Sequence, residues 1–365
     1  MEKYTHRRRR RPRQGFLITL CVALASVLAV LIVVTAYIDH TFGLINQVDP
    51  STQATISSED METIFNTETI DPTFDGTTID PSDVTWDTVP SEPVVDHPDI
   101  INILLIGQDG RAYDERGRSD SMILCTFNTI TNTVTMSSFL RDLYVQIPGQ
   151  EDNRINAAYS IGGMSLLAET LELNFGVHID ACVEVSFYGF PQIVDKLGGI
   201  DLELTQAEAE YLNRRGNWGV WGGTGENVWT LTAGVNHMNG EQALAYSRIR
   251  DIGDDFGRSE RQRKVLSILM EQCKSLSLTS AMDLLNTFLP LITTDMTNQQ
   301  ITSYAMDLFP MLTNLNTVSQ RIPTWGTYSN AVIRGMQVLL PDIPKIRQQL
   351  TDCGVIPPTD PTEST

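Results

Sequence analysis

The feature that most constrains this chain is a run of 23 residues without a charged side chain, from Phe16 to Ile38. A helix of that length is long enough to cross the hydrocarbon core of a bilayer. Residues 1–15 hold six arginines and one lysine against a single acid, and a basic flank of this kind predicts that the N-terminus is cytoplasmic. We therefore expect a basic cytoplasmic tail over 1–15, one transmembrane anchor over 16–38 and an extracellular remainder.

Two other interpretations of this N-terminal segment are weaker. The apolar core of a cleaved signal peptide is about 7–15 residues long and precedes a site of small residues, whereas this run is longer and ends in Thr35-Ala36-Tyr37-Ile38. A basic run directly before a membrane span also needs no nucleic acid to explain it. The prediction is an uncleaved signal anchor in a single-pass protein of the cell membrane, with no nucleic-acid partner.

The segment after the anchor is strongly acidic. Residues 39–99 contain fourteen Asp or Glu and no Lys or Arg, so they cannot bury enough apolar surface to offset the entropy of ordering. We expect a disordered extracellular stalk over 39–99 and, from the same composition, a disordered tail over 357–365. The remaining residues, 100–356, are long enough to fold as one domain with a sizeable core.

Strand patterns and helix patterns follow one another within 100–356. Ile100 to Ile106 is a nearly unbroken apolar run, typical of a buried central strand, and the segments 120–128 and 133–139 alternate around a turn, which predicts a hairpin. Further strands are expected at 181–187 and 200–204, and helices at 164–173, 190–197, 260–275 (capped by Ser259), 281–291 and 298–312. This order predicts a layered α/β/α domain with helices on both faces of a mixed central sheet.

The cysteines and histidines offer little chemistry. The five cysteines show no C-x-x-C and no metal-ligand spacing, and the five histidines form no cluster in the sequence. Zinc chemistry and a Ser-His-Asp triad are therefore not expected. Cys125 and Cys182 lie in apolar runs and are expected to be buried thiols, while a Cys273–Cys353 disulfide stays an open possibility.

Arginine is unusually frequent for a chain of net charge −19, with five arginines within residues 248–263. Arg248 and Arg250 would share one face of an extended segment. Arg258 and Arg261 would share one face of a helix start, where the helix dipole also attracts anions. Because the planar guanidinium fits phosphate, the pattern predicts a phosphate or pyrophosphate site. A solvated basic face paired with neighbouring acids explains the same pattern equally well.

Two aspartates are placed where a metal could bind. Asp109 follows the first buried strand and Asp120 opens the next, so both would lie at one end of the sheet if these strands are neighbours. Open α/β sheets bind ligands at the carboxyl ends of their strands, and two carboxylates with substrate phosphates are a typical Mg²⁺ environment. Each aspartate could instead cap a turn.

Arg118 and Arg141 also follow strand or turn signals. Phosphoryl transfer needs no nucleophilic side chain, because positioning and cations supply most of the stabilisation.

Seven short motifs together resemble the LytR-CpsA-Psr family of bacterial cell-wall enzymes, in the family's order and over nearly the whole of the predicted domain. They are NILLIGQD at 102–109, GRSDS at 117–121, LRD at 140–142, RINAAY at 154–159, VDKLGGID at 194–201, ALAYSRIR at 243–250 and DFGRSERQ at 255–262. Two positions depart from the family pattern: Leu140 stands where Pro is usual, and Arg154 where Lys is frequent. Neither change removes a charge.

The resemblance implies a phosphotransferase that moves an anionic glycopolymer, such as teichoic acid, from a polyprenyl-pyrophosphate-linked donor to a sugar hydroxyl of peptidoglycan. By matching position, Asp109 and Asp120 would bind Mg²⁺ (or Mn²⁺). The implied pyrophosphate-binding residues are Arg118, Arg141, Asn156, Arg248, Arg250, Arg258, Arg261 and Gln262. The implied catalytic residues are Arg118, Arg141, Arg248, Arg250 and Asp120.

Two other functions would use the same residues. A regulatory wall protein could hold polyprenyl pyrophosphate without turnover, although passive binding of an anion needs no pair of aspartates. A lipid pyrophosphatase would use water as the acceptor with the same arginine clamp. The sequence does not separate hydrolysis from transfer, and it does not identify the polymer.

Overall fold

The computed structural model describes residues 43, 45–49, 74–86, 96–108, 119–186, 188–216, 229–250, 252, 255–274 and 289–357. The predicted tail at 1–15, the predicted anchor at 16–38 and residues 358–365 lie outside this part of the chain. Among the helices that are described, none is both long enough and apolar enough to span a bilayer.

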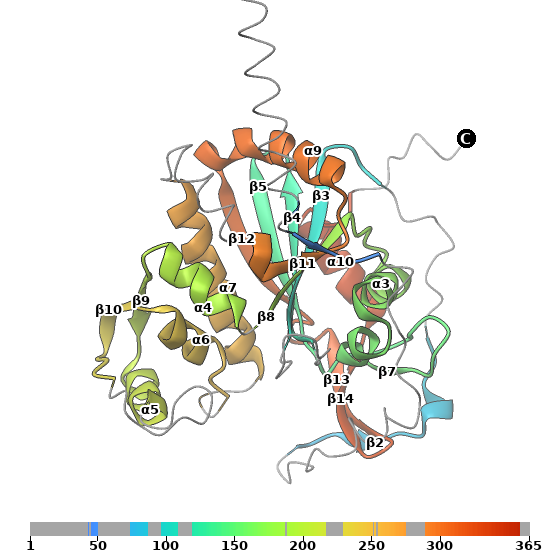
Figure 1. Ribbon diagram of the computed structural model, residues 1–365. Helices are drawn as coiled ribbons and strands as arrows, with labels where there is room; N and C mark the ends of the chain where they lie inside the picture. Colours follow the sequence, from blue (N-terminus) through green and yellow to red (C-terminus); the bar gives the residue numbers. More distant parts are fainter. Residues whose placement is uncertain are drawn as a thin grey trace, which may run out of the picture. The chain divides into compact units, whose positions relative to one another are not determined.

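A seven-stranded mixed sheet forms the centre of the domain (Figure 1). Its strand order is β1 (Asn46–Gln47), β11 (Ile292–Thr294), β8 (Ala181–Ser186), β3 (Ile100–Gln108), β4 (Ser119–Asn128), β5 (Thr133–Phe139) and β12 (Asn316–Ile322). Strand β3 pairs antiparallel with β4 and parallel with β8, and β12 pairs parallel with β5. The predicted strands and the predicted β4–β5 hairpin are confirmed to within about two residues.

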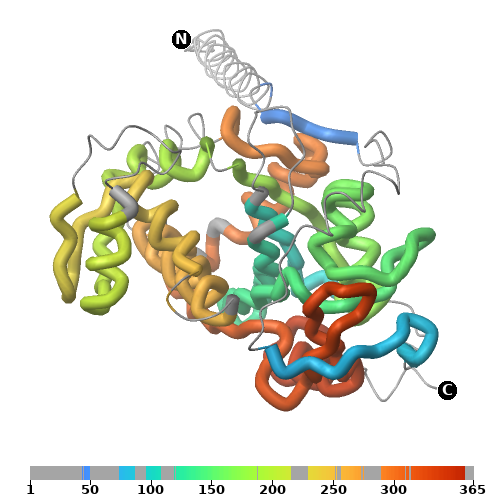
Figure 2. The backbone as a smooth tube through the Cα atoms, turned by 90° about the horizontal axis from the view of Figure 1, so that it is seen from below, coloured from blue at the N-terminus to red at the C-terminus, as the bar shows by residue number. Residues whose placement is uncertain are grey.

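The pleat of β4 sends alternate side chains into two separate cores, as strand geometry requires. Met122 and Leu124 pack with α3 (Ile155–Phe175) and α10 (Ile343–Asp352) on one face. Ile123 and Cys125 face the other side, where Leu266 and other residues of α7 (Asp255–Lys274) cover the sheet. Viewed from below, α3 and α7 lie on opposite sides of the central strands (Figure 2). The predicted layered α/β arrangement with a mixed central sheet is therefore confirmed.

A further group of elements packs on the outer side of α7. It comprises α4 (Gly189–Lys196), β9 (Ile200–Leu204), α5 (Gln206–Gly216), β10 (Gly234–Met238) and α6 (Gly240–Ser247). Leu202, Leu212 and Val265 belong to the core that these elements share with α7. Helix α6 begins with a capping box, in which Asn239 Oδ1 accepts from the Gln242 N–H and Gln242 Oε1 accepts from the Asn239 N–H, each at 2.9 Å. This cap fixes the start of the helix whose other end carries Arg248.

Part of the segment predicted as a disordered stalk belongs to the folded domain, so the boundary predicted at residue 100 is wrong. Strand β1 joins the central sheet, and β2 (Thr77–Thr78) pairs with β13 (Tyr328–Ile333), which pairs in turn with β14 (Met336–Pro341). Trp86 stacks on Tyr144 with ring centroids 6.1 Å apart, and its indole N–H donates to Asp152 Oδ2 at 2.7 Å. These partners lie far away in the sequence, where local composition does not reveal them.

Helix boundaries differ from the predictions at four places. Helix α7 begins at Asp255, so Ser259 does not cap it; the Ser259 hydroxyl instead donates to the Phe256 carbonyl at 2.9 Å within the helix. Helix α3 starts at Ile155, well before the predicted start at residue 164. Its first half was missed because Gly162 and Gly163 have non-helical backbone angles that interrupt the helical pattern. Residues 289–291, the described end of the helix predicted at 281–291, form the 3₁₀ turn η3 before β11, and α9 (Asn298–Leu308) continues into the 3₁₀ helix η4 (Phe309–Asn314).

The described cysteines carry no disulfide. Cys125 and Cys182 are buried free thiols, as expected. Burial raises the pKa of the Cys125 thiol to about 12, which keeps it protonated and unreactive. Cys353 is also a free thiol, so the Cys273–Cys353 disulfide that the sequence left open is not formed.

Candidate functional site at one edge of the sheet

Strands β3, β5, β8 and β12 all end at the same edge of the sheet, where β4 begins. The register places Gln108 beside Ser119 and Ser186, and places Ile322 beside Phe139. Ligands of open α/β sheets bind at carboxyl ends of this kind. Asp109 and Arg118 adjoin these strand ends in the sequence, but they lie outside the described residues, as does the side chain of Asp120. Their predicted roles therefore stay predictions.

Arg141 follows the end of β5 and lies in a group of buried and half-buried charges at this edge. The Leu140 N–H donates to the Ile322 carbonyl at 2.9 Å, which holds the start of the loop against β12. Asp142 lies between two arginines: its Oδ2 is 3.5 Å from Arg141 Nε and its Oδ1 is 3.1 Å from Arg154 Nη1. The Arg154 side chain is only 3% exposed. Both guanidinium groups therefore contact the same carboxylate at this edge.

Asn156 lies in the first turn of α3, directly beside this arginine group. Its N–H contacts the Arg141 carbonyl at 3.5 Å, and its side chain is buried. Within the described residues, the Asn156 Oδ1 and the hydroxyls of Ser119 and Ser138 are buried without a hydrogen-bond partner. Unsatisfied buried polar atoms are rare, and each calls for a water, an ion or a ligand as its partner. All three lie near the same edge of the sheet, which supports a binding site there.

The Arg248–Arg250 segment leaves the end of α6. Arg248 is the C-terminal cap residue of α6 and is half-buried, Ile249 is completely buried in the core of the outer group, and Arg250 is exposed. Because the residue between them points into the core, the two arginines flank it and face away from the core. The predicted alternation of this segment is consistent with this placement.

Arg261 makes structural contacts within the protein, and its predicted phosphate contact stays a prediction. Its Nε donates to Glu208 Oε1 at 2.8 Å, its Nη1 to the Ile249 carbonyl at 3.2 Å and its Nη2 to the Ile252 carbonyl at 2.6 Å. The guanidinium donors therefore contact protein atoms on three sides. Burial alone would raise the pKa of Glu208, but hydrogen bonds from Arg261 and Thr205 outweigh it and lower the pKa below its usual value. Arg261 thus fixes the Arg248–Arg250 segment to α7.

Arg258 lies in the first turn of α7 and is buried, and Gln262 is half-buried one turn further along the helix. Contacts between neighbouring elements bring this turn to the edge that carries Arg141. The Arg321 guanidinium, near the end of β12, lies 4.1 Å from the ring centroid of Phe256 in the same helical turn as Arg258. Since the next residue of β12 accepts the hydrogen bond from Leu140, Arg258 and Arg141 border the same region.

Three polar residues at this edge are not among the individual site residues predicted from the sequence. Ser138 and Arg321 are directly opposite each other on β5 and β12, and neither belongs to a recognisable motif. Arg263 is buried, and donates through Nε to Ser319 Oγ at 2.8 Å and through Nη1 to Ser259 Oγ at 3.3 Å. Burial, with a smaller contribution from Arg321, lowers the pKa of Arg263 to about 10. Only the strand pairing of β5 with β12 reveals these residues as part of the edge.

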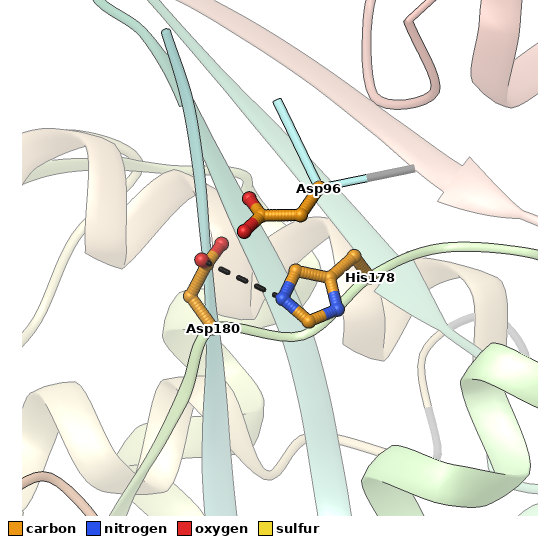
Figure 3. A group of neighbouring side chains, drawn as sticks. All are labelled: Asp96, His178 and Asp180. Atoms are coloured by element: carbon orange, nitrogen blue, oxygen red, sulfur yellow. Dashed lines mark ion pairs between the residues drawn. The ribbon is translucent and has the colours of Figure 1, made fainter. Parts of the chain in front are cut away.

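A different group of possible metal ligands lies near the opposite edge of the sheet, where β3 and β8 begin. In Figure 3, Asp96 and Asp180 both face the imidazole of His178. His178 Nε2 is 3.8 Å from Asp180 Oδ1, and its Nδ1 is 3.2 Å from Glu172 Oε1. Asp180 Oδ2 also accepts from the Asn102 N–H at 2.7 Å. These contacts describe a cluster of ion pairs at the start of the strands, away from the candidate site.

Comparison with known proteins agrees with this fold. The model of the LytR_cpsA_psr family matches residues 66–352, a range that begins within the acidic segment. A curated relative from Enterococcus faecalis, the polyisoprenyl-teichoic acid--peptidoglycan teichoic acid transferase TagU, is 32% identical over 239 residues, which cover 62% of this chain and 72% of that protein.

Two solved structures share the fold and carry ligands in their descriptions. "TagT bound to LIIa-WTA" is 27% identical with a TM-score of 0.56, covering 70% of this chain and 91% of that one. "LytR-CPS2A-psr family protein YwtF (TagT) with bound octaprenyl pyrophosphate lipid" is 26% identical with a TM-score of 0.53, covering 70% and 90%. The second ligand contains the pyrophosphate group that the arginine pattern predicts.

Proposed function

Because the chain belongs to the LytR_cpsA_psr family, we propose that it transfers an anionic glycopolymer from a polyprenyl-pyrophosphate donor to a sugar hydroxyl of peptidoglycan. The names of its relatives support the reaction class, since TagU is a teichoic acid transferase acting on peptidoglycan. The related structure with octaprenyl pyrophosphate supports the donor chemistry. The identity of the polymer that this chain carries is left open.

One structural observation supports this function most strongly. The buried Arg154 and Arg258, the half-buried Arg141 and the unsatisfied Oδ1 of Asn156 border one edge of the sheet. A diphosphate carries several negative charges and needs both cations and hydrogen-bond donors. Guanidinium groups satisfy both needs, and their forks match the geometry of phosphate oxygens. We expect Arg248 and Arg250, which follow α6, to extend this cationic lining.

The reaction is a phosphoryl transfer. The acceptor hydroxyl oxygen attacks the phosphorus that carries the glycopolymer, and a new phosphorus–oxygen bond forms. The bond from that phosphorus to the bridging oxygen breaks, and polyprenyl phosphate leaves with the electron pair, while the hydroxyl proton passes to a base. Arginines that contact the non-bridging oxygens stabilise the charge in the transition state, which is where fixed cations contribute most.

Asp109 and Asp120 are the residues that would hold Mg²⁺ or Mn²⁺. Asp120 is the second residue of β4, and Asp109 follows the last residue of β3, which pairs with the first residue of β4. Carboxylate oxygens are ligands that both ions prefer. A bound divalent ion would neutralise part of the negative charge of the diphosphate. The protein's own arginines would then orient the diphosphate against it.

The polyprenyl donor implies that the protein works at a membrane. The uncharged run from Phe16 to Ile38 and the basic residues before it support a single-pass anchor with the catalytic domain outside the cell. An anchored enzyme would keep the candidate site close to the outer leaflet, where a lipid-linked donor is found.

The proposal is tested by incubating the full-length protein in detergent with a radiolabelled polyprenyl-pyrophosphate-linked polymer, Mg²⁺ and peptidoglycan fragments. We expect label that is covalently attached to the fragments and an equal amount of polyprenyl phosphate. Release of phosphorylated polymer without attachment would identify a lipid pyrophosphatase. Donor that is bound but unchanged would identify a binding protein. Either of these outcomes would overturn the proposed transfer.

A further inference from the structure

Three aromatic rings form a cluster beside the candidate site. Phe256 lies in the first turn of α7, Trp325 in the loop after β12, and Tyr328 at the start of β13. Their ring centroids are 5.0, 5.9 and 5.8 Å apart for the pairs Phe256–Trp325, Phe256–Tyr328 and Trp325–Tyr328. These distances are typical of aromatic rings in direct contact. Trp325 is nevertheless 71% exposed, so most of the largest ring in the cluster faces solvent.

Arg321 completes the cluster. Its guanidinium carbon lies 4.1 Å from the ring centroid of Phe256 and 5.3 Å from that of Trp325, which is cation–π geometry. Within the described part of the chain, the Arg321 guanidinium makes no hydrogen bond and no ion pair. A guanidinium that contacts a ring through its flat face keeps the N–H groups along its edge available. The cluster therefore offers an exposed aromatic surface next to a fixed set of hydrogen-bond donors.

The position of this cluster follows from strand and helix contacts. Ile322, the residue after Arg321, pairs with Phe139 and accepts a hydrogen bond from the Leu140 N–H. Arg141 is the next residue along that loop. On the other side of the cluster, Phe256 precedes Arg258 by two residues in the first turn of α7. The aromatic cluster thus lies next to the loop that carries Arg141 and includes a residue from the same helical turn as Arg258.

A purely structural role does not account for the exposure of Trp325. Phe256 and Tyr328 are half-buried and can join α7 to β13 by themselves. A ring that is mostly in water contributes little to burial. Small-molecule sites combine apolar or aromatic surface with a few placed polar groups. The pyranose ring of a sugar has the complementary form, because its C–H faces are apolar and its edge carries hydroxyl groups.

We propose that Trp325, Phe256, Tyr328 and Arg321 form the subsite for a pyranose residue of the acceptor glycan strand. In this subsite the sugar face lies on Trp325 and a pair of adjacent hydroxyls accepts from Arg321. The inference depends on the proposed transfer function, because that function supplies the glycan. We assign the subsite to the acceptor because a glycan strand of the cell wall reaches the site from outside the protein and therefore needs an open surface. The donor is already held by its diphosphate and its lipid.

A binding measurement tests the subsite without requiring turnover. Purified, peptide-free peptidoglycan glycan strands are titrated by calorimetry into the full-length protein in detergent, in the absence of donor. We expect Trp325→Ala to raise the Kd about tenfold, in the range of an aromatic contact, and Trp325→Phe to retain most of the affinity. Ile130→Ala is the matched control. Ile130 is 69% exposed in the β4–β5 hairpin turn, at the end of β4 and β5 that is opposite the candidate site. Equal Kd values for all four proteins would overturn the proposal.

Steady-state kinetics then distinguish the acceptor from the donor. We expect Trp325→Ala to raise the KM for glycan strands about tenfold while the KM for the lipid donor is unchanged. A raised donor KM with an unchanged acceptor KM would show that the cluster binds the donor polymer and would overturn the assignment. The outcomes also separate the two proposals. Binding of glycan strands that depends on Trp325, without transfer, would refute the transferase and keep the subsite. Transfer with a normal KM for the acceptor in Trp325→Ala would keep the transferase and refute the subsite.

Discussion

Arg261 on α7 donates through Nε to Glu208 Oε1 on α5 at 2.8 Å, and both side chains are about nine-tenths buried. The same guanidinium donates to two carbonyls in the segment that follows Arg248. Arg261 therefore joins three parts of the chain: α5, α7 and the loop that carries Arg248 and Arg250. It therefore holds the loop that carries two of the predicted site residues.

The first prediction concerns the stability of this ion pair. Arg261→Ala should lower the free energy of unfolding by about 3–5 kcal/mol, because it leaves the Glu208 carboxylate buried without its cation. Replacing both residues, as Arg261→Met with Glu208→Leu, should recover most of this loss. Urea unfolding of the single and double variants measures both effects. A loss of transfer in Arg261→Ala with wild-type stability would show instead that Arg261 contacts the substrate.

The second prediction follows from the lowered pKa of Glu208. A carboxyl group whose pKa is lower in the folded state stabilises the fold above its ordinary pKa, and this contribution is lost as the pH falls through the folded-state value. The Tm difference between wild type and Glu208→Gln should therefore be constant from pH 7 to about 5 and should shrink at lower pH. Thermal melts from pH 7 to 3 measure it. A difference that does not change with pH would contradict the ionised pair.

The third prediction separates binding of the substrate from folding at Arg248. Arg248→Ala should reduce the transfer rate by about 10²–10³, the factor typical of a group that stabilises charge in the transition state. Its Tm should stay within about 2 °C of wild type, because the side chain is only half-buried. The transfer assay and a thermal melt on the same preparation provide the test. A large fall in Tm would assign Arg248 to a structural ion pair.

The fourth prediction concerns the ordered part of the acidic segment. Trp86→Ala should lower the free energy of unfolding by about 2–3 kcal/mol, since it removes the stacking on Tyr144, the hydrogen bond to Asp152 and the associated burial. Thr85→Ala, at the exposed neighbouring position, should change it by less than about 0.5 kcal/mol. Urea unfolding of the two variants gives the comparison. Equal free energies of unfolding for the two variants would show that residues 74–86 belong to the stalk and not to the folded domain.

The central strands were predictable because their signal is local. Ile100–Ile106 is apolar except for Asn102, and 120–128 and 133–139 alternate around a turn, so period and composition alone define β3, β4 and β5. The first half of α3 was missed for the opposite reason. That helix is buried along most of its length and is interrupted at Gly162 and Gly163, so it lacks the one-sided apolar pattern that identifies a surface helix.

The candidate site was predictable only where charge and motif coincide. The sequence predicts several arginines of the candidate site, but it misses Arg321 and does not show which arginines bind protein atoms. Glu208 lies 53 residues before Arg261, and no local rule pairs them. In the same way, Arg321 and Trp325 gain their significance from the pairing of β12 with β5 and from the contact with Phe256. These relationships arise from tertiary packing, which the sequence pattern does not encode locally.

The central claim is that arginines and a carboxylate-bound divalent ion meet on one diphosphate at this edge of the sheet. The most direct test is a crystal structure of the protein with polyprenyl pyrophosphate and Mn²⁺, in which anomalous scattering locates the ion. We predict a peak bound by Asp109 and Asp120, with diphosphate oxygens in contact with Arg141, Arg248 and Arg258. A peak at Asp96, His178 and Asp180, or a diphosphate bound away from this edge, would contradict the account.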